Sequence, residues 1–208
     1  MGKDKIERLL GRRERKKQQT REALEATAWR LFQRKGYDET TVEDITDAVD
    51  VSTRTFFRYF DSKEAVLFGD WRSNLDRMTG SIISRPPEEP PLQALYESAR
   101  QFIEFIKPNE PRLLMRNELA RNSRKIGDYE RNVINPEFER VVAEALAQRL
   151  GVDAESDPRP SIIAAVAVAA YNAARKMWVA SGGERSMAEL LGQAFEFINY
   201  QADTVPDK

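Results

Sequence analysis

A cluster of basic and hydroxyl-bearing side chains in the first third of the chain could bind nucleic acid. Guanidinium groups can form paired hydrogen bonds with the edge of a guanine, and hydroxyl groups bind phosphate oxygens. The side chains that we expect to enter a DNA groove are those of Thr53, Arg54, Thr55 and Arg58. The neighbouring residues that we expect beside the sugar-phosphate backbone are Thr41, Ser52, Phe57, Tyr59 and Lys63.

Two short helices joined by a tight turn must position these side chains. The apolar residues that repeat at helical spacing in the first helix are Val42, Ile45 and Val49. Thr41 and Asp44 have the spacing of a capping box at its start, and Ser52 can cap a second helix over residues 53–59. A helix this short is stable only when it is packed on a scaffold. The pattern therefore predicts a helix-turn-helix whose second helix keeps an outer face for DNA.

Segment 40–67 resembles the DNA-binding domain of the TetR family of bacterial repressors. The residues that match the family's pattern and spacing are Thr40, Val42, Ile45, Val51, Ser52, Thr55, Tyr59, Phe60, Lys63, Glu64 and Leu67. Three positions depart from that pattern. Thr46 stands where alanine is commoner, Asp50 where the turn glycine is usual, and Phe57 where a tyrosine hydroxyl can meet a phosphate.

The resemblance implies an all-α protein with two parts. The first is an N-terminal three-helix DNA-binding domain with a helix-turn-helix, and the second is a larger helical domain for ligand binding and dimerisation. The function that it implies is that of a ligand-responsive transcriptional regulator, most simply a repressor. Such a protein binds a palindromic operator as a homodimer and is released by a small, mostly apolar effector.

The net charge of −1 conceals a basic N-terminus. Residues 1–35 contain twelve Lys and Arg against five Asp and Glu, whereas residues 36–63 contain three against seven. The basic run ahead of the helix-turn-helix includes Arg12, Arg13, Arg15, Lys16 and Lys17. Such a run is often only a solvated leader. Because it precedes a helix-turn-helix, we interpret residues 1–19 as a basic arm for the DNA backbone or a minor groove.

The composition argues against several kinds of chemistry. The 208 residues include no cysteine and no histidine, so disulfides, zinc-finger ligation and histidine-based catalysis are excluded. We predict no catalytic residue, metal or cofactor. Two alternatives remain open: an architectural DNA-binding protein without an effector, and, less favoured, a helical enzyme with a helix-turn-helix-like element. The lack of a long apolar run or a signal core indicates a cytoplasmic protein.

Proline positions and helical periodicity predict the domain organisation. We expect the DNA-binding domain at 20–67, with its first helix over 20–35. A capping box of Asp61 and Glu64 is expected to begin a fourth helix that reaches about residue 83, and its part over 68–84 is the connecting helix. Four prolines within residues 85–91 remove backbone donors, so we place the domain boundary there. The larger domain is expected at 92–203, with helices over 92–106, 110–121, 128–150, 159–181 and 187–201.

The helix expected at 159–181 is apolar nearly all round between Ile162 and Ala170. A helix of this kind is buried on more than one side, and its many alanines allow close approach of another helix. The core of a monomer explains part of this pattern. A helix that packs against a second copy of the chain would show the same pattern. The resemblance to the TetR family implies such a dimer, formed through the last two helices.

Aromatic and polar side chains of the larger domain could line an elongated, mostly apolar ligand pocket. The candidates are Phe102, Phe105, Arg112, Leu113, Arg116, Asn117, Tyr171, Asn172, Arg175 and Trp178. For any one of them, packing in the core or pairing with an acidic neighbour is the simpler explanation. The second half also resembles the mycofactocin-type subgroup of the family, thought to bind acyl-CoA-like ligands. That resemblance implies an acyl chain with an anionic head near the arginines.

Overall fold

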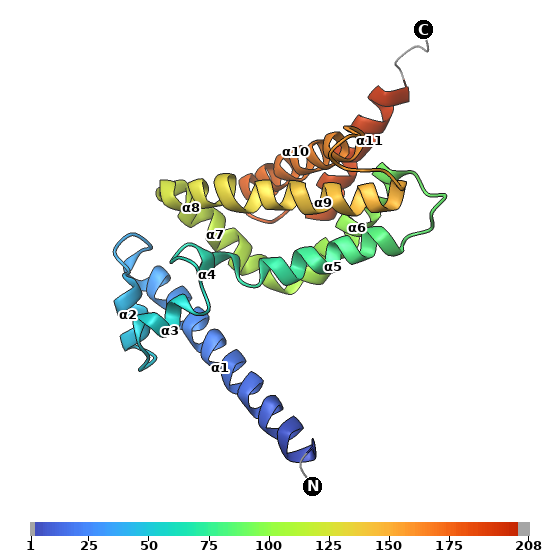
Figure 1. The fold of residues 1–208 in the computed structure, drawn as a ribbon. Coiled ribbons are helices and arrows are strands. Elements are labelled where there is room, and N and C mark those ends of the chain that lie inside the picture. Colours follow the sequence, from blue (N-terminus) through green and yellow to red (C-terminus); the bar gives the residue numbers. More distant parts are fainter. Residues whose placement is uncertain (1–2, 204–208) are drawn as a thin grey trace. The chain divides into compact units, whose positions relative to one another are not determined.

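The computed structural model describes residues 3–203, and all of the regular structure within this range is helical (Figure 1). The all-α class expected from the sequence is thereby confirmed. The chain divides into two compact units, one ending at Gly69 and the other beginning at Asp70.

The first unit holds a small core between a long helix and three short ones. Its helices are α1 (Lys3–Lys35), α2 (Val42–Asp47), α3 (Thr53–Phe57) and α4 (Ala65–Phe68). The side chains of Leu24, Ile45, Phe56 and Val66 are fully buried between them. Because α2 and α3 contain only six and five residues, they depend on this packing for their stability.

Helix α1 begins far earlier than the sequence analysis expected. It starts at Lys3 rather than near residue 20, so the basic segment is a helical extension and not an irregular arm. Lys, Arg, Glu and Gln are good helix formers, and they dominate this stretch. Glu14 and Lys17 pair across one turn at 3.8 Å, which adds a small stabilisation. Gly36 ends the helix with φ +89°, as expected for a C-terminal cap.

A single long helix after the helix-turn-helix was a wrong prediction. Gly69, with φ +58°, separates α4 from α5 (Trp71–Ser84). The predicted capping box is also replaced by other contacts. The Ser62 hydroxyl accepts from the backbone N–H of Ala65 at 3.3 Å, while the Glu64 carboxylate accepts from the Tyr37 hydroxyl at 2.5 Å.

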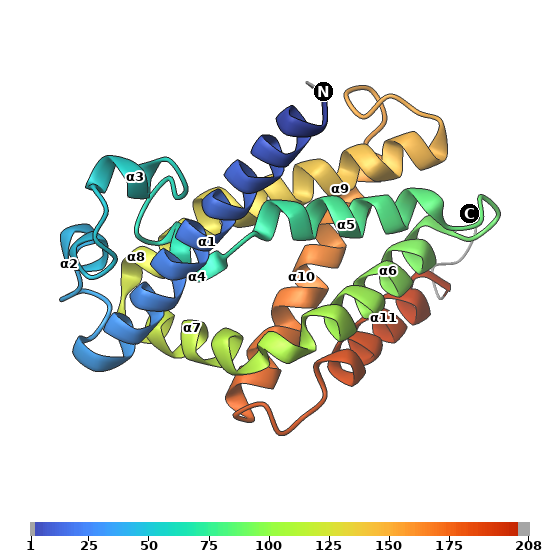
Figure 2. The same cartoon turned by 90° about the horizontal axis from the view of Figure 1, so that it is seen from below.

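The second unit is a bundle of longer helices around an apolar core. They are α5, α6 (Pro91–Ile106), η1 (Lys107–Asn109), α7 (Glu110–Asn122), α8 (Arg124–Tyr129), η2 (Glu130–Ile134), α9 (Asn135–Leu150), α10 (Arg159–Ala180) and α11 (Met187–Asp203). Helix α10 packs against α9 and α11, α5 packs against α9, and α6 lies beside α11 (Figure 2). Leu75, Met78 and Ile82 of α5 belong to the core of this unit.

The proline-rich segment 85–91 therefore lies inside the second unit and does not divide the chain. Arg149, near the end of α9, donates hydrogen bonds to the carbonyl oxygens of Arg85, Pro86 and Glu89. The Arg85 and Glu89 side chains are also ion-paired. Prolines leave these carbonyls without helical partners, and the arginine supplies the missing donors.

The helix expected at 128–150 begins at residue 124 and contains one wide turn. Segment η2 is a π-helix, in which the backbone N–H of Asn135 donates to the carbonyl of Glu130, five residues earlier. Pro136 follows directly and has no N–H, and its ring would clash with the carbonyl four residues back. A wider turn relieves that clash. Such turns inside helices are frequent at functional sites.

Helix α10 leaves one apolar stripe uncovered in the single chain. The residues exposed along this stripe include Ile162, Ala165, Ala169, Ala173 and Met177. The opposite face holds buried alanines and Trp178 against α9 and α11. By length and composition alone α10 could cross a membrane. Its packing on α9 and α11 accounts for the apolar residues of its buried face.

Candidate DNA-binding surface and effector pocket

The two predicted helix caps of the helix-turn-helix are present. The Thr41 hydroxyl accepts from the N–H of Asp44 at 3.1 Å, and the Asp44 carboxylate accepts from the N–H of Thr41 at 2.7 Å. The Ser52 hydroxyl accepts from the N–H of Thr55 at 3.2 Å. Between the helices Asp50 has φ 55°, the left-handed conformation that a turn glycine adopts without strain. The departure at Asp50 thus keeps the turn geometry.

The outer face of α3 presents an aromatic ring between two arginines. Arg54 and Arg58 are exposed, and Phe57 exposes 55% of its surface. Thr53 and Thr55 are half-buried, and the Thr55 hydroxyl lies 3.0 Å from that of Ser52. The guanidinium groups can reach base edges, while an exposed phenyl ring suits a thymine methyl group.

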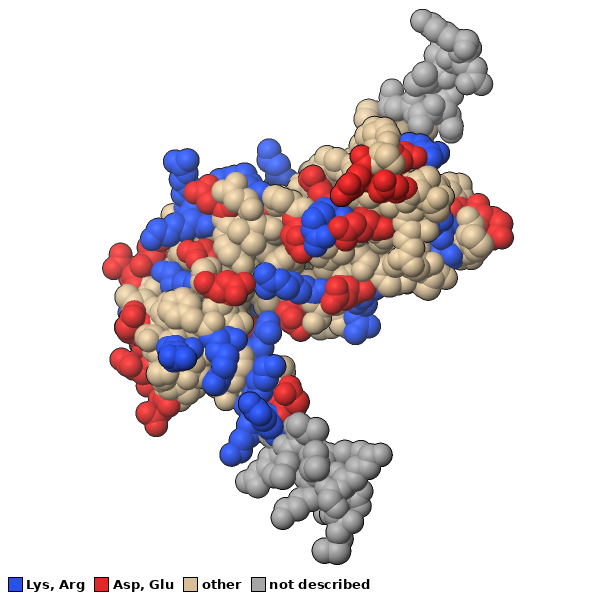
Figure 3. Space-filling model, in the orientation of Figure 1, with Lys and Arg blue, Asp and Glu red and all other residues tan. Residues whose placement is uncertain are grey.

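A groove of about 400 Å³ lies between α1 and the end of the helix-turn-helix. Its lining residues are Glu14, Arg15, Lys17, Gln18, Arg21 and Tyr59. The Tyr59 hydroxyl, at the edge of this groove, accepts from Arg58 at 3.2 Å. Figure 3 shows basic side chains along α1 and acidic side chains over the edge that carries α2. The charge of the first unit is thus concentrated on one side, as phosphate binding requires.

The basic run of α1 is not uniform. Arg15 and Lys17 line the groove, whereas Arg13 and Lys16 are exposed away from it. The side chain of Arg12 lies outside the described part of the chain. The structure therefore distinguishes Arg15 and Lys17, which line the groove, from the other two cations, which do not. The sequence alone gives no basis for this distinction.

Lys63 has a different environment from the one that the sequence analysis expected. Its ammonium donates to the carbonyl oxygens of Tyr37 at 2.8 Å and Thr40 at 2.7 Å. It also lies 4.1 Å from the centre of the Tyr37 ring. These contacts hold the loop after α1, so this lysine serves the fold of the unit.

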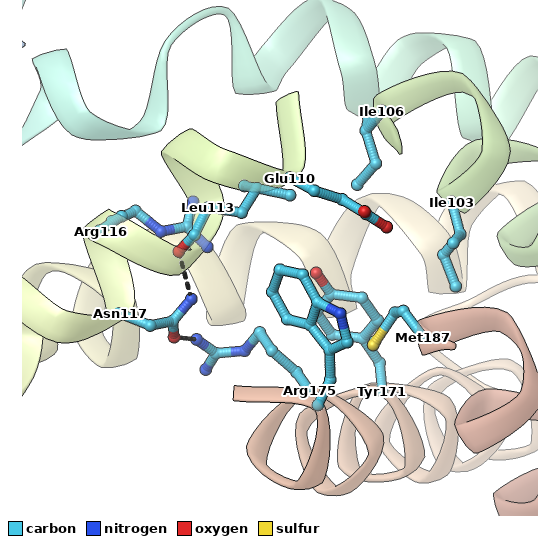
Figure 4. Close-up of a pocket in the computed structure, with 10 residues that line it drawn as sticks. Ile103, Ile106, Glu110, Leu113, Arg116, Asn117, Tyr171, Arg175 and Met187 are labelled. Carbon is cyan, nitrogen blue, oxygen red and sulfur yellow. Dashed lines mark hydrogen bonds between the residues drawn. The ribbon is translucent and has the colours of Figure 1, made fainter. Parts of the chain in front are cut away.

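A pocket inside the second unit is lined by α6, α7, α10 and the start of α11 (Figure 4). The lining residues are Ile103, Ile106, Glu110, Leu113, Arg116, Asn117, Tyr171, Arg175, Trp178 and Met187. It leaves about 20 Å³ for the centre of a water-sized sphere, which is room for about one water molecule. A larger ligand must therefore displace side chains.

The polar groups of the pocket gather where α7 faces α10. The Arg175 guanidinium donates to the Asn117 amide oxygen at 2.5 Å and lies 3.2 Å from the Glu130 carboxylate. Burial lowers the pKa of Arg116; Glu130 raises this pKa and Arg175 lowers it further. Two guanidinium groups thus share one apolar site beside the carboxylate of Glu130.

Six of the ten residues predicted for the pocket line it, and the other four do not. The six are Leu113, Arg116, Asn117, Tyr171, Arg175 and Trp178. Phe102 packs against the core, Arg112 is exposed, and Asn172 lies beside Arg175 without reaching the pocket. Phe105 is 49% exposed under the guanidinium of Arg77. Ile103 and Ile106 face the pocket instead, because adjacent helix positions differ by about 100°.

A helix-turn-helix with exposed arginines, in a chain whose second unit encloses a partly polar pocket, defines a DNA-binding regulator. The family described as bacterial regulatory proteins, tetR family, matches residues 24–68, and that described as the MftR C-terminal domain matches residues 89–202. The chain belongs to the TetR family of transcriptional regulators. Members of this family bind operator DNA and act as dimers.

Named relatives and solved structures agree with this family. The HTH-type transcriptional regulator TcmR of Streptomyces glaucescens is 34% identical over 175 residues, which cover 81% of this chain and 76% of TcmR. The regulator MftR of Mycobacterium tuberculosis is 24% identical, with 91% of this chain and 94% of MftR covered. FadR of Thermus thermophilus, a TetR-family repressor solved with lauroyl-CoA, is similar in fold. Its TM-score is 0.56 at 24% identity, and 90% of this chain and 96% of FadR are covered.

Proposed function

We propose that this protein is a homodimeric repressor that leaves its operator when a small, mostly apolar effector with an anionic head enters the pocket. The observation that carries the proposal is the pairing of apolar walls with the guanidinium groups of Arg116 and Arg175 in one pocket. We expect it to act in the cytoplasm, where its operator DNA lies.

The first unit supplies the contacts to DNA. Arg54, Phe57 and Arg58 would read bases in the major groove from the exposed face of α3. Tyr59 and the groove beside it, with Arg15 and Lys17, would hold phosphates. The helical extension of α1 takes the role expected of the basic arm.

The dimer would form through α10 and α11. The uncovered alanine stripe of α10 allows a second copy to approach closely, and Phe197 of α11 exposes 66% of its surface. An exposed apolar stripe of this length typically marks an interface. A two-fold axis between two such helix pairs would space the reading heads for a palindromic operator.

The effector would be a fatty acid or its CoA thioester. The walls formed by Ile103, Ile106 and Leu113 suit a hydrocarbon chain, and guanidinium groups suit its anionic head. The fold shared with FadR, which was solved with lauroyl-CoA, supports testing this class first. Because the pocket is small as it stands, entry of a chain would move α7 against α10, and that displacement would alter the spacing of the reading heads.

Operator selection followed by effector titration tests the proposal. DNA fragments selected by the purified protein should share a palindrome. Laurate or lauroyl-CoA should then raise the melting temperature of the free protein, because a ligand at 100 times its dissociation constant stabilises the folded state by about 2.7 kcal/mol. The same ligand should release the operator, and operator DNA should weaken ligand binding by the same factor. Selected DNA that no such ligand releases would instead favour the architectural alternative.

A further inference from the structure

Arg175 occupies a junction between three segments of the second unit. From α10 its guanidinium donates to Asn117 of α7 at 2.5 Å (Figure 4). It also lies 3.2 Å from the carboxylate of Glu130 in η2. The side chains of Arg175 and Glu130 are only 18% and 16% exposed. The Arg175 Nε atom is buried and has no hydrogen-bond partner. A buried donor without an acceptor costs free energy, and a ligand oxygen can remove that cost.

Glu130 belongs to the wide turn that joins α8 to α9. It begins the π-helix η2, where Asn135 donates to its carbonyl across five residues. A π turn of this kind is rare inside a helix and occurs frequently at functional sites. The Glu130 carboxylate connects the wide turn directly to the pocket arginine.

We propose that Arg175, assisted by Arg116, is the anchor for the carboxylate of a monocarboxylate effector, and that this carboxylate displaces Glu130. Glu130 is in this sense a built-in competitor that occupies the anchor when no effector is bound. Once Glu130 no longer contacts Arg175, η2 and the adjoining helix α8 could move. Effector binding in the pocket would in this way change the conformation of the rest of the unit. This inference rests on the proposed function and names the effector class and the contact that detects it.

The chemistry of the pocket selects this class over other anions. An arginine fork matches the planar pair of oxygens of a carboxylate, which is the group that Glu130 already presents to it. The carboxylate of Glu110 lies toward Ile103 and Ile106, away from Arg116 and Asn117 (Figure 4). A second anionic group at that end would meet Glu110, so a dicarboxylate is disfavoured. The apolar walls between the two ends suit an alkyl or aryl body.

Ligands that differ only in the head group test the anchor in the full-length protein. Laurate and 1-dodecanol share an alkyl chain, 2-naphthoate and 2-naphthalenemethanol share an aryl body, and lauroyl-CoA carries the laurate chain without a free carboxylate. Affinities are measured by calorimetry, and operator release is measured in parallel. We expect Glu130→Gln to strengthen the binding of both carboxylates about tenfold, because their competitor is removed, and to leave the alcohols unchanged. Tighter binding cannot result from misfolding.

Three further variants complete the test. Arg175→Gln should weaken carboxylate binding at least tenfold, with little effect on the alcohols. In a protein that already carries Arg175→Gln, adding Glu130→Gln should change carboxylate affinity very little, since the two residues act through one contact. Glu110→Gln is the matched control, because it removes the same charge without removing the ion pair. It should change the preference for carboxylate over alcohol far less than Glu130→Gln does.

Hydrogen exchange identifies the proposed response. Laurate should increase amide exchange in residues 124–134, whereas 1-dodecanol should not. Equal effects of Glu130→Gln on acid and alcohol, or unchanged exchange in this segment, would overturn the anchor. If lauroyl-CoA still released the operator while the alcohols did not, the proposed function would stand without the carboxylate anchor. If no ligand bound or released DNA, both proposals would fail together.

Discussion

The ammonium of Lys63 lies over the ring of Tyr37, 4.1 Å from its centre, and donates to the carbonyl of the same residue at 2.8 Å. A second bond reaches the carbonyl of Thr40, whose side chain is fully buried. One cation therefore ties the loop between α1 and α2 to the segment after α3. These contacts hold the start of the helix-turn-helix against the end of the same motif.

We predict that Lys63→Ala destabilises the first unit. Two carbonyl groups would lose their donor, which costs about 1–3 kcal/mol when the groups are buried. The measurement is denaturant unfolding, with circular dichroism as the signal. DNA binding should weaken for all sequences to a similar extent, since the reading face is no longer held in place.

Arg54→Ala is the matched contrast. Arg54 is exposed on α3, so unfolding should be almost unchanged. Binding should weaken by roughly 1–3 kcal/mol only for operators that keep the contacted guanine. A panel of operator variants separates the two patterns, and a shared pattern for both variants would contradict the division of roles.

Asp50→Gly should stabilise the protein. A left-handed backbone costs a non-glycine residue roughly 1–2 kcal/mol, and glycine loses about 0.5–1 kcal/mol more unfolded-state freedom. The net expectation is a gain of about 0.5 kcal/mol. Asp47→Gly, at the end of α2, should instead destabilise slightly, by about 0.3 kcal/mol. Thermal unfolding of both variants would reveal the opposite signs, and a loss of stability in both would mean that the Asp50 side chain has a role in the turn.

The groove beside Tyr59 predicts a graded salt dependence of DNA binding. Replacing both Arg15 and Lys17 by Gln should reduce the slope of log affinity against log salt by about 0.9 for each phosphate that is no longer neutralised. Arg13 and Lys16 lie outside the groove, so the same change there removes equal charge as a control. Filter binding over a salt series measures both slopes. Equal reductions of the two slopes would indicate attraction by overall charge and no defined phosphate site.

The capping box makes stability depend on pH through Asp44. Hydrogen bonds from Lys35 and from Thr41 lower the pKa of Asp44 below its usual value. In the unfolded chain this carboxyl has a pKa of about 3.9. The stabilisation that the Asp44 carboxylate contributes is therefore complete above that pH and is lost as the pH falls toward the lower pKa of the folded state. Asp44→Asn should therefore be less stable than the parent at pH 7, and the difference should shrink toward pH 2. Asp47→Asn, outside the cap, should show no such convergence.

The all-α fold and the helix-turn-helix could be predicted because they depend on local patterns. Thr41, Ser52 and Gly36 occupy caps whose spacing is readable in the sequence, and the TetR pattern covers the rest of the helix-turn-helix. The start of α1 could not be predicted, because a charged, helix-forming run has the same composition as a disordered leader. The break at Gly69 was missed because one glycine inside a helical pattern is ambiguous.

The pocket could be predicted only in part because its walls come from distant segments. Tyr171, Arg175 and Trp178 share one face of α10, and helical spacing predicts that they lie together. Ile103 and Met187 resemble ordinary core residues, and no local signal distinguishes them. Glu130 was missed for a different reason. Its importance comes from a π turn and from a partner on another helix, and neither leaves a local pattern before the chain folds.

The uncovered stripe of α10 predicts where the dimer can be broken. Ala169→Glu, near the middle of the exposed stripe, would place two carboxylates in the proposed interface, because two-fold symmetry introduces every substitution twice. Burying two unpaired charges should weaken dimerisation at least about tenfold. Gln148→Glu on the exposed face of α9 adds the same charge elsewhere and should leave the dimer intact. Sedimentation equilibrium measures both, and the Ala169→Glu protein should also lose cooperative binding to a palindromic operator while keeping its helical content. A variant that stays dimeric at nanomolar concentration would place the interface away from this stripe.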